Sequence, residues 1–174
     1  RGIGLEISKL FVSRGLDVVV VARDFSAFPQ GLKDKAQIVP FDLQEVHSIP
    51  QLAQEIGDID ILINNIGGMG RSGTEVFEDF TGWNDVYYKN AGLTTRLTMK
   101  MISHMQAKNW GRVITIASIY GKEAGGKPWF TMAKSSEIAL MKSLAGYFFG
   151  ITFNSISPGH IRVKEEEELK TIDP

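Results

Sequence analysis

The chain has 174 residues, of which 43% are hydrophobic and 22% are charged, and its net charge at pH 7 is -1. This length favours one domain, over residues 1–174, and the balanced charge gives no electrostatic reason to bind nucleic acid or an anionic membrane. The absence of cysteine excludes disulfides, thiolate metal sites and a catalytic thiol. No apolar run is long enough to span a bilayer and no leader opens the chain, so we expect a cytoplasmic protein.

A helix is predicted at the start of the chain, directly after the motif Arg1-Gly2-Ile3-Gly4. Apolar residues at positions 3, 7, 10 and 11 recur at the spacing of a buried helical face. A glycine-rich helix start of this kind normally follows a strand. We therefore expect a strand and part of a loop to precede Arg1.

Strands and helices alternate along the rest of the chain. The predicted strands are 17–22, 37–41, 59–63, 112–117 and 151–157. The predicted helices are 46–56, 74–80, 83–110 (one long helix or two abutting ones) and 128–148, with loops at 25–35 and 67–73 and an acidic lid or helix at 164–169. This order predicts an α/β fold with a doubly wound, Rossmann-like parallel sheet and helices on both faces. Ligands bind such sheets beyond the carboxyl ends of the strands.

Polar residues and glycines stand at each of these strand ends. In chain order they are Arg23 and Asp24, Asp42 and Leu43, Asn64-Asn65-Ile66-Gly67, Ser118, and Pro158-Gly159. Any one of them alone is explained by turn chemistry. The ordered set, together with the glycine-rich start, resembles the short-chain dehydrogenase/reductase family over nearly the whole chain.

The resemblance implies a dinucleotide site at this edge of the sheet. Glycines there let the backbone approach the pyrophosphate at a helix N-terminus. Asn64-Asn65-Ile66-Gly67 is similar to the family's Asn-Asn-Ala-Gly, and Asp42 to the acid that meets the adenine. The cofactor-binding residues implied are Arg1, Gly2, Ile3, Gly4, Arg23, Asp42, Leu43, Asn64, Asn65, Ile66, Gly67, Lys134, Pro158, Gly159 and Ile161.

Two arginines bear on the choice of dinucleotide. Arg1 and Arg23 fall near the expected ribose, and guanidinium groups suit a 2′-phosphate. This pattern favours NADP(H), whereas Asp24 keeps NAD(H) open and both arginines could simply lie on the surface.

The family's active site contains an Asn, a Ser, a Tyr and a Lys, and the resemblance implies these roles for Asn90, Ser118 and Lys134. Phe130 stands at the tyrosine position, four residues before Lys134. Phenylalanine has no ionisable proton, so the usual general acid is missing. Three explanations remain open: a deliberate substitution, a natural member with another donor, or a protein that binds cofactor without turnover. Tyr120 is the nearest phenol in the sequence, although a packing role explains it better.

The leading hypothesis is therefore an oxidoreductase that moves hydride between NADP(H) and a small carbonyl or alcohol substrate. The alternative is a non-catalytic NAD(P)-binding regulatory or scaffold protein of the same fold. Val163 departs from the family, which often has a threonine there to meet the cofactor phosphates. The histidines are scattered, so no metal site is proposed.

The family usually continues with a further strand beyond the end of this sequence, and its members pair through the helices matched here by 83–110 and 128–148. We expect a homodimer or homotetramer, because apolar residues on these helices exceed one buried face. They are Met101, Met105, Leu140, Met141 and Leu144.

Overall fold

The computed structural model describes residues 2–26, 28–42, 48–68 and 80–161. Its strands are β1 (Val19–Ala22), β2 (Gln37–Pro40), β3 (Ile61–Asn64), β4 (Gly111–Ile116) and β5 (Ile151–Ile156). β1 pairs with β2, and β3, β4 and β5 form a second sheet in that order; every pairing is parallel. The predicted parallel α/β architecture is confirmed, with the described strands divided between two sheets.

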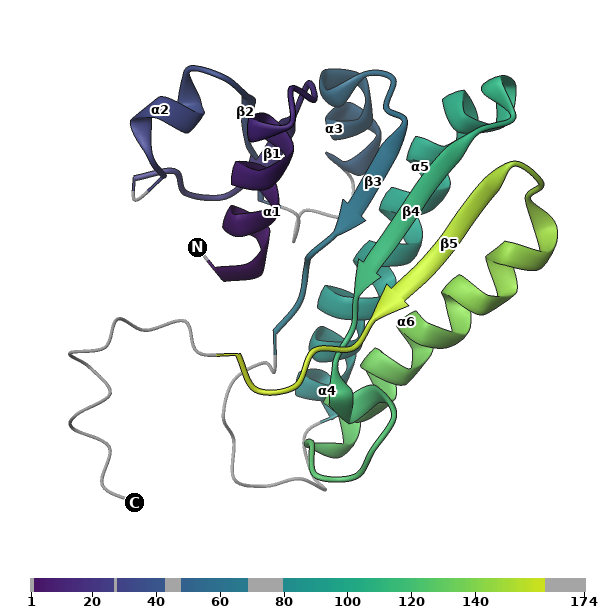
Figure 1. Cartoon of the computed structure of the whole chain (residues 1–174). Helices are drawn as coiled ribbons and strands as arrows, with labels where there is room; N and C mark the ends of the chain where they lie inside the picture. Colours follow the sequence, from purple (N-terminus) through teal and green to yellow (C-terminus); the bar gives the residue numbers. More distant parts are fainter. Residues whose placement is uncertain (1, 27, 43–47, 69–79, 162–174) are drawn as a thin grey trace.

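Helices lie on both sides of the strands (Figure 1). They are α1 (Gly2–Ser13), α2 (Gln30–Lys33), α3 (Ile49–Ile56), α4 (Phe80–Tyr87), a π-helical segment (Tyr88–Gly92), α5 (Leu93–Lys108), a 3-10 turn (Ile119–Gly121) and α6 (Pro128–Tyr147). In Figure 1, α1 lies in front of the strands, whereas α5 and α6 lie behind β4 and β5. Within the described part of the chain, no helix is long and apolar enough to cross a membrane.

The register of the larger sheet aligns the carboxyl ends of its strands. Asn64, at the end of β3, pairs with Thr115 of β4, and Ile116, at the end of β4, pairs with Ile156 of β5. Parallel strands in register bring the residues that follow them to one edge of the sheet. The segments that start at positions 65, 117 and 157 therefore leave the sheet side by side.

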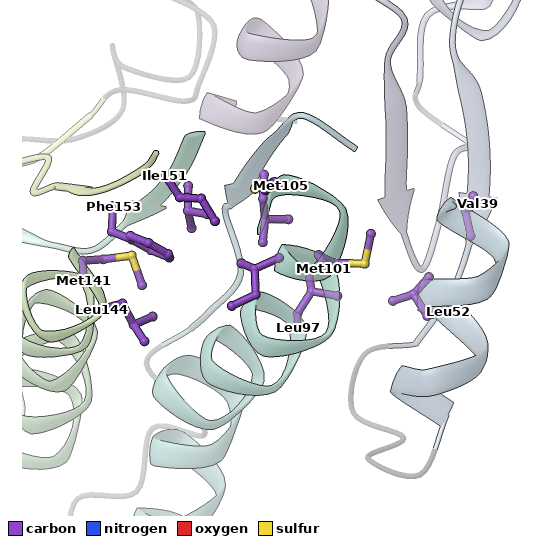
Figure 2. Close-up of a cluster of buried hydrophobic side chains, with 12 residues drawn as sticks. Val39, Leu52, Leu97, Met101, Met105, Met141, Leu144, Ile151 and Phe153 are labelled. Carbon is purple, nitrogen blue, oxygen red and sulfur yellow. The ribbon is translucent and has the colours of Figure 1, made fainter. Parts of the chain in front are cut away.

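The hydrophobic core includes one side of α5, which packs against β3, β4 and α3 (Figure 2). Its buried Leu97, Met101 and Met105 share one cluster with Val39 of β2 and Phe153 of β5. Burying a side chain of this size stabilises a fold by about 1.5–3 kcal/mol. The cluster therefore joins the two sheets across α5.

Packing in this core corrects one argument from the sequence. Met101, Met105, Met141 and Leu144 are buried inside the chain, and Leu140 packs partly against the same cluster. These residues pack in the core of a single chain. They do not supply the surplus apolar surface on which the expected homodimer or homotetramer was based.

Two stretches of secondary structure also differ from the prediction. The segment predicted as a loop at 25–35 contains α2, because Pro29 precedes its first turn and Leu32 is buried. The helix predicted from residue 83 begins at Phe80, changes to a π-helix at Tyr88–Gly92 and ends at Lys108. It ends there because Asn109 adopts the left-handed conformation, with φ 52°. The predicted segments 67–73, 74–80 and 164–169 fall wholly or largely outside the described residues.

Candidate active site

Three of the predicted site residues meet at the carboxyl edge of the larger sheet. Gly67, which follows β3, has φ 141°, a backbone conformation that residues other than glycine rarely adopt. A Cβ atom at Gly67 would overlap Asn90 Oδ1 and would lie 3.0 Å from Lys134 Nζ. Glycine is therefore required at this position, because Asn90 and Lys134 occupy the space that a side chain would need.

Asn90 holds the loop after β3 with its whole amide group. Its Nδ2 donates to the carbonyl oxygens of Gly68 (3.0 Å) and Val86 (2.7 Å), and its Oδ1 accepts from Gly68 N (3.3 Å). Asn90 is fully buried and lies in the π-helical segment. A π-turn inside a helix changes the direction of the side chains that follow, and such turns are frequent at functional sites.

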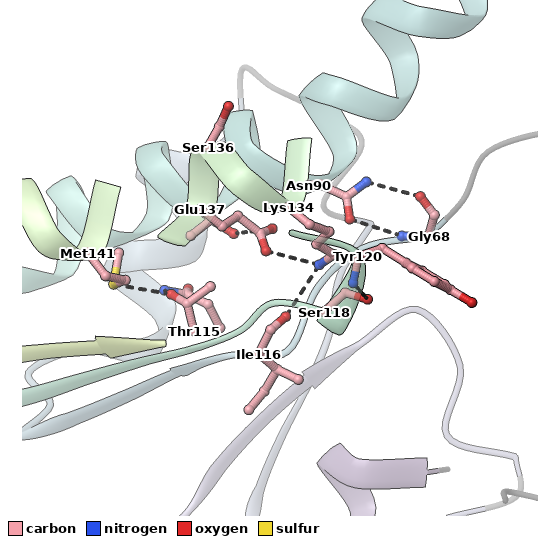
Figure 3. Close-up of polar contacts among 12 residues, drawn as sticks. Gly68, Asn90, Thr115, Ile116, Ser118, Tyr120, Lys134, Ser136, Glu137 and Met141 are labelled. Atoms are coloured by element: carbon pink, nitrogen blue, oxygen red, sulfur yellow. Dashed lines mark hydrogen bonds and ion pairs between the residues drawn. The ribbon is translucent and has the colours of Figure 1, made fainter. Parts of the chain in front are cut away.

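Lys134 lies on α6 and is only 4% exposed. Its Nζ donates to the carbonyl oxygen of Ile116 at 3.3 Å and to Glu137 Oε2 at 3.0 Å (Figure 3). The ring centroid of Phe130 lies 5.8 Å from the same nitrogen. Positions 130 and 134 therefore lie on one helix face, as predicted. The ring at position 130 is that of phenylalanine and has no hydroxyl.

Glu137 is the site residue that sequence reasoning missed. It is fully buried, and its Oε1 accepts a 3.4 Å hydrogen bond from Thr94 of α5. Burial raises the pKa of the Glu137 carboxyl, and the bonds from Lys134 and Thr94 only partly oppose this shift. A signal was available, since Phe130, Glu137 and Met141 recur at the spacing of the buried face of α6.

Ser118 follows β4, and its Oγ accepts a hydrogen bond from Tyr120 N at 3.3 Å. The backbone N–H of Ile119 donates to the carbonyl oxygen of Pro158 at 2.9 Å. This bond ties the loop after β4 to the loop after β5. Ser118 and Pro158 are therefore brought to the same part of the sheet edge, and the half-buried Tyr120 lies beside them (Figure 3).

The start of α1 approaches the loop after β3. A Cβ atom at Gly4 would lie 2.6 Å from Asn65 Nδ2, so a larger residue at position 4 would displace the Asn65 side chain. Asn64 is buried inside the sheet, where its Nδ2 donates to Thr98 Oγ1 (3.0 Å) and Thr115 Oγ1 (3.3 Å). The glycine-rich start of α1 includes Gly2 and Ile3. It thus adjoins the Asn64–Gly67 segment at one edge of the sheet.

The residues predicted to select the dinucleotide are less completely described. Arg23 is exposed after β1 and Asp42 is exposed after β2, the two strands of the smaller sheet. Asp24 accepts hydrogen bonds from Ser26 N (2.7 Å) and Ser26 Oγ (2.9 Å), which lower the pKa of its carboxyl. Ile66 is half-buried after β3, whereas Gly159 and Ile161 are exposed after β5. Arg1, Leu43 and Val163 lie outside the described residues.

Among the residues that the structure describes, no cluster of three or more histidine, aspartate or glutamate side chains could hold a metal ion. His104 instead lies beside two surface carboxylates, with Nδ1 3.2 Å from Asp58 Oδ2 and Nε2 3.6 Å from Asp60 Oδ1.

Comparisons with known proteins agree with this geometry. Residues 1–172 match the family described as short chain dehydrogenase. The chain is 31% identical to the 3-oxoacyl-(acyl-carrier-protein) reductase FabG of Haemophilus influenzae, an alignment that covers 97% of this chain and 74% of the relative. It is also 31% identical to the Escherichia coli FabG, over 92% of this chain and 70% of that protein.

A solved structure described as a short chain dehydrogenase/reductase family protein superposes with a TM-score of 0.81 at 30% identity, over 91% of this chain and 69% of that one. A parallel α/β fold with its polar residues gathered at the carboxyl edge of the sheet defines a Rossmann-like protein. The chain belongs to the short-chain dehydrogenase/reductase family.

The raised pKa of Glu137 predicts how stability depends on pH. Between its ordinary value of about 4.5 and the raised value, the folded chain binds more protons than the unfolded chain. This group therefore makes stability fall as pH rises through its folded pKa. We expect the free energy of unfolding of the wild type, measured relative to Glu137→Gln, to decrease with pH across that window in urea titrations followed by circular dichroism.

The exposed Glu55 provides a matched control, because Glu55→Gln removes the same charge from the surface. Its stability difference from the wild type should stay nearly constant across the same pH window. Parallel pH curves for the wild type and Glu137→Gln would contradict the prediction.

Proposed function

We propose that this chain binds a nicotinamide dinucleotide at the carboxyl edge of its larger sheet and transfers hydride between it and a small carbonyl or alcohol. The observation that carries the proposal is the convergence of Gly67, Asn90 and Lys134 at this edge. Glycine at position 67 lets Asn90 and the buried Lys134 ammonium reach this part of the backbone. Such a cradle suits a ligand with phosphates and ribose hydroxyls. The named reductases among the relatives support the same reaction class.

The residues have distinct roles in this proposal. Gly2, at the start of α1, leaves room for the pyrophosphate near the helix N-terminus, and Gly4 leaves room for Asn65 of the loop after β3. Lys134 donates to the ribose hydroxyls, and Ser118 donates to the substrate oxygen. The bound dinucleotide supplies or accepts the hydride. The contribution of the chain is to hold the reacting groups in near-attack geometry and to stabilise charge on the substrate oxygen.

A second candidate function is dinucleotide binding without efficient turnover. The observation that favours it is Phe130, which is buried beside Lys134 and has no proton to give. General acids contribute roughly 10²- to 10⁴-fold to rate, so loss of the phenol is compatible with a regulatory or scaffold role.

We expect NADP(H) to bind more tightly than NAD(H). The exposed Arg23 can pair with a 2′-phosphate, whereas Asp24 is held by Ser26 in its own turn. Calorimetric titration with both dinucleotides measures the preference. Arg23→Ala should reduce it by roughly tenfold, which corresponds to the loss of one charged hydrogen-bonded contact of about 1.4 kcal/mol. Equal affinity, or tighter NAD(H), in the unmodified chain would contradict the role of the arginine.

We expect Phe130→Tyr to raise reductase activity with NADPH across a panel of ketones, by up to about 10²- to 10⁴-fold. The phenol would stand one helical turn before Lys134, whose ammonium favours the phenolate and lowers a tyrosine pKa from about 10. NADPH binding, measured in parallel, should change little.

Tyr120→Phe serves as the control, because Tyr120 is the phenol nearest to Ser118 in the sequence. If Phe130→Tyr binds NADPH but turns over no faster than the unmodified chain, position 130 is not a disabled acid. If Tyr120→Phe abolishes existing activity, Tyr120 is the donor instead.

We propose that the chain assembles as a homodimer or homotetramer through α5 and α6, the helices that pair in the resembling family. The large apolar side chains of both helices are mostly buried, but Met99 of α5 is 45% exposed. Light scattering of the unmodified chain should give a mass at least twice 19.3 kDa. A purely monomeric species at micromolar concentration would contradict the proposal.

A further inference from the structure

A buried carboxylate stands beside the lysine of the site, on the same helix. Glu137 Oε2 accepts from Lys134 Nζ at 3.0 Å (Figure 3), and Thr94 donates to Glu137 Oε1 at 3.4 Å. Glu137 is fully buried and Lys134 is nearly so. Lys–Glu pairs at this helical spacing usually lie on the surface, where they are worth little. Here the pair faces the sheet, three residues from the site's own lysine.

The neighbours of the ammonium explain why a carboxylate is needed. Lys134 Nζ also donates to the carbonyl oxygen of Ile116, and the Phe130 ring lies near it. A carbonyl oxygen and a ring face do not neutralise a buried ammonium, whose desolvation is costly without a counter-charge. Position 130 carries no group that could do so. Glu137 is the described carboxylate that is bonded to Lys134.

We propose that Glu137 is a positioning residue that fixes the Lys134 ammonium against Gly67, at the edge where the dinucleotide binds. Thr94 of α5 holds the Glu137 carboxylate in place, so the carboxylate in turn restrains the position of the Lys134 ammonium. One charged hydrogen bond is about twice as strong as its neutral equivalent, which makes it the dominant restraint on a long, flexible side chain. This inference rests on the proposed dinucleotide binding.

The test is a double-mutant cycle read out by NADPH affinity, using fluorescence titration and no substrate. The four proteins are the unmodified chain, Glu137→Gln, Lys134→Met and the double variant. If Glu137 acts through Lys134, Glu137→Gln weakens NADPH binding by about tenfold in the unmodified chain. In the Lys134→Met background the same change has less than about a twofold effect, because the ammonium it positions is gone.

Two further variants separate positioning from charge and from folding. Glu137→Asp keeps the charge and should retain more affinity than Glu137→Gln. Glu55→Gln removes an exposed charge from α3 and should leave NADPH affinity unchanged. Circular dichroism melts establish that each variant folds. If Glu137→Gln fails to fold, the comparison of Glu137→Asp with the unmodified chain, again with and without Lys134→Met, carries the test.

Three outcomes would overturn the inference. Tighter binding by Glu137→Gln would mean that the carboxylate only repels the anionic ligand. Unchanged affinity, or an equal loss with and without Lys134, would mean that it does not act through the lysine. If the unmodified chain binds neither NADPH nor NADH, the proposed function fails first, and this result is distinguishable from failure of the positioning role alone.

Discussion

One buried ammonium organises the site and the elements around it. Lys134 must be neutralised and hydrogen-bonded where it lies, because a charge removed from water is costly unless it is paired. Glu137 supplies the charge and the carbonyl oxygen of Ile116 supplies a further acceptor, so α6 is fixed against the end of β4. Thr94 extends the network to α5. Removing one partner from such a pair typically costs about 3–5 kcal/mol, which exceeds most single hydrophobic contacts.

The loops of the site are held by neutral hydrogen bonds rather than by further charges. The side-chain amide of Asn90 binds both polar groups of Gly68, which ties the loop after β3 to the π-helical segment. Ile119 N donates to the carbonyl oxygen of Pro158, which ties together the loops after β4 and β5. Because α5 also carries the core that joins the two sheets, the same helix supports both the fold and the charged pair. Rigid elements of this kind hold a site more accurately than loops alone.

The sequence predicted features that depend on local pattern, and it missed those that depend on tertiary burial. The alternation of strands and helices predicted the parallel sheet, and the order of polar strand ends predicted the family. Glu137 was missed because a Lys–Glu pair on a helix reads as a solvated face until the packing of α6 is known. The π-turn at Asn90 and the burial of Met101 were missed for the same reason. Both arise from contacts between α5 and its neighbours, which no local period encodes.

The paired lysine changes how the missing phenol should be interpreted. In the resembling family the lysine lowers the pKa of a tyrosine, and an ammonium can do this because its charge is available to that neighbour. In this chain the ammonium is already bonded to a carboxylate, and the residue at position 130 is an apolar ring. The Phe130 ring and the Glu137 carboxylate are therefore compatible neighbours of Lys134. The ring carries no charge, and the carboxylate neutralises the ammonium. A neutral phenol is not a counter-ion, so the ammonium is neutralised by Glu137 whichever ring stands at position 130. Positions 130 and 137 should thus be considered together. The electrostatic field at a phenol introduced at position 130 would depend on the Glu137 carboxylate, which lies one helical turn beyond Lys134.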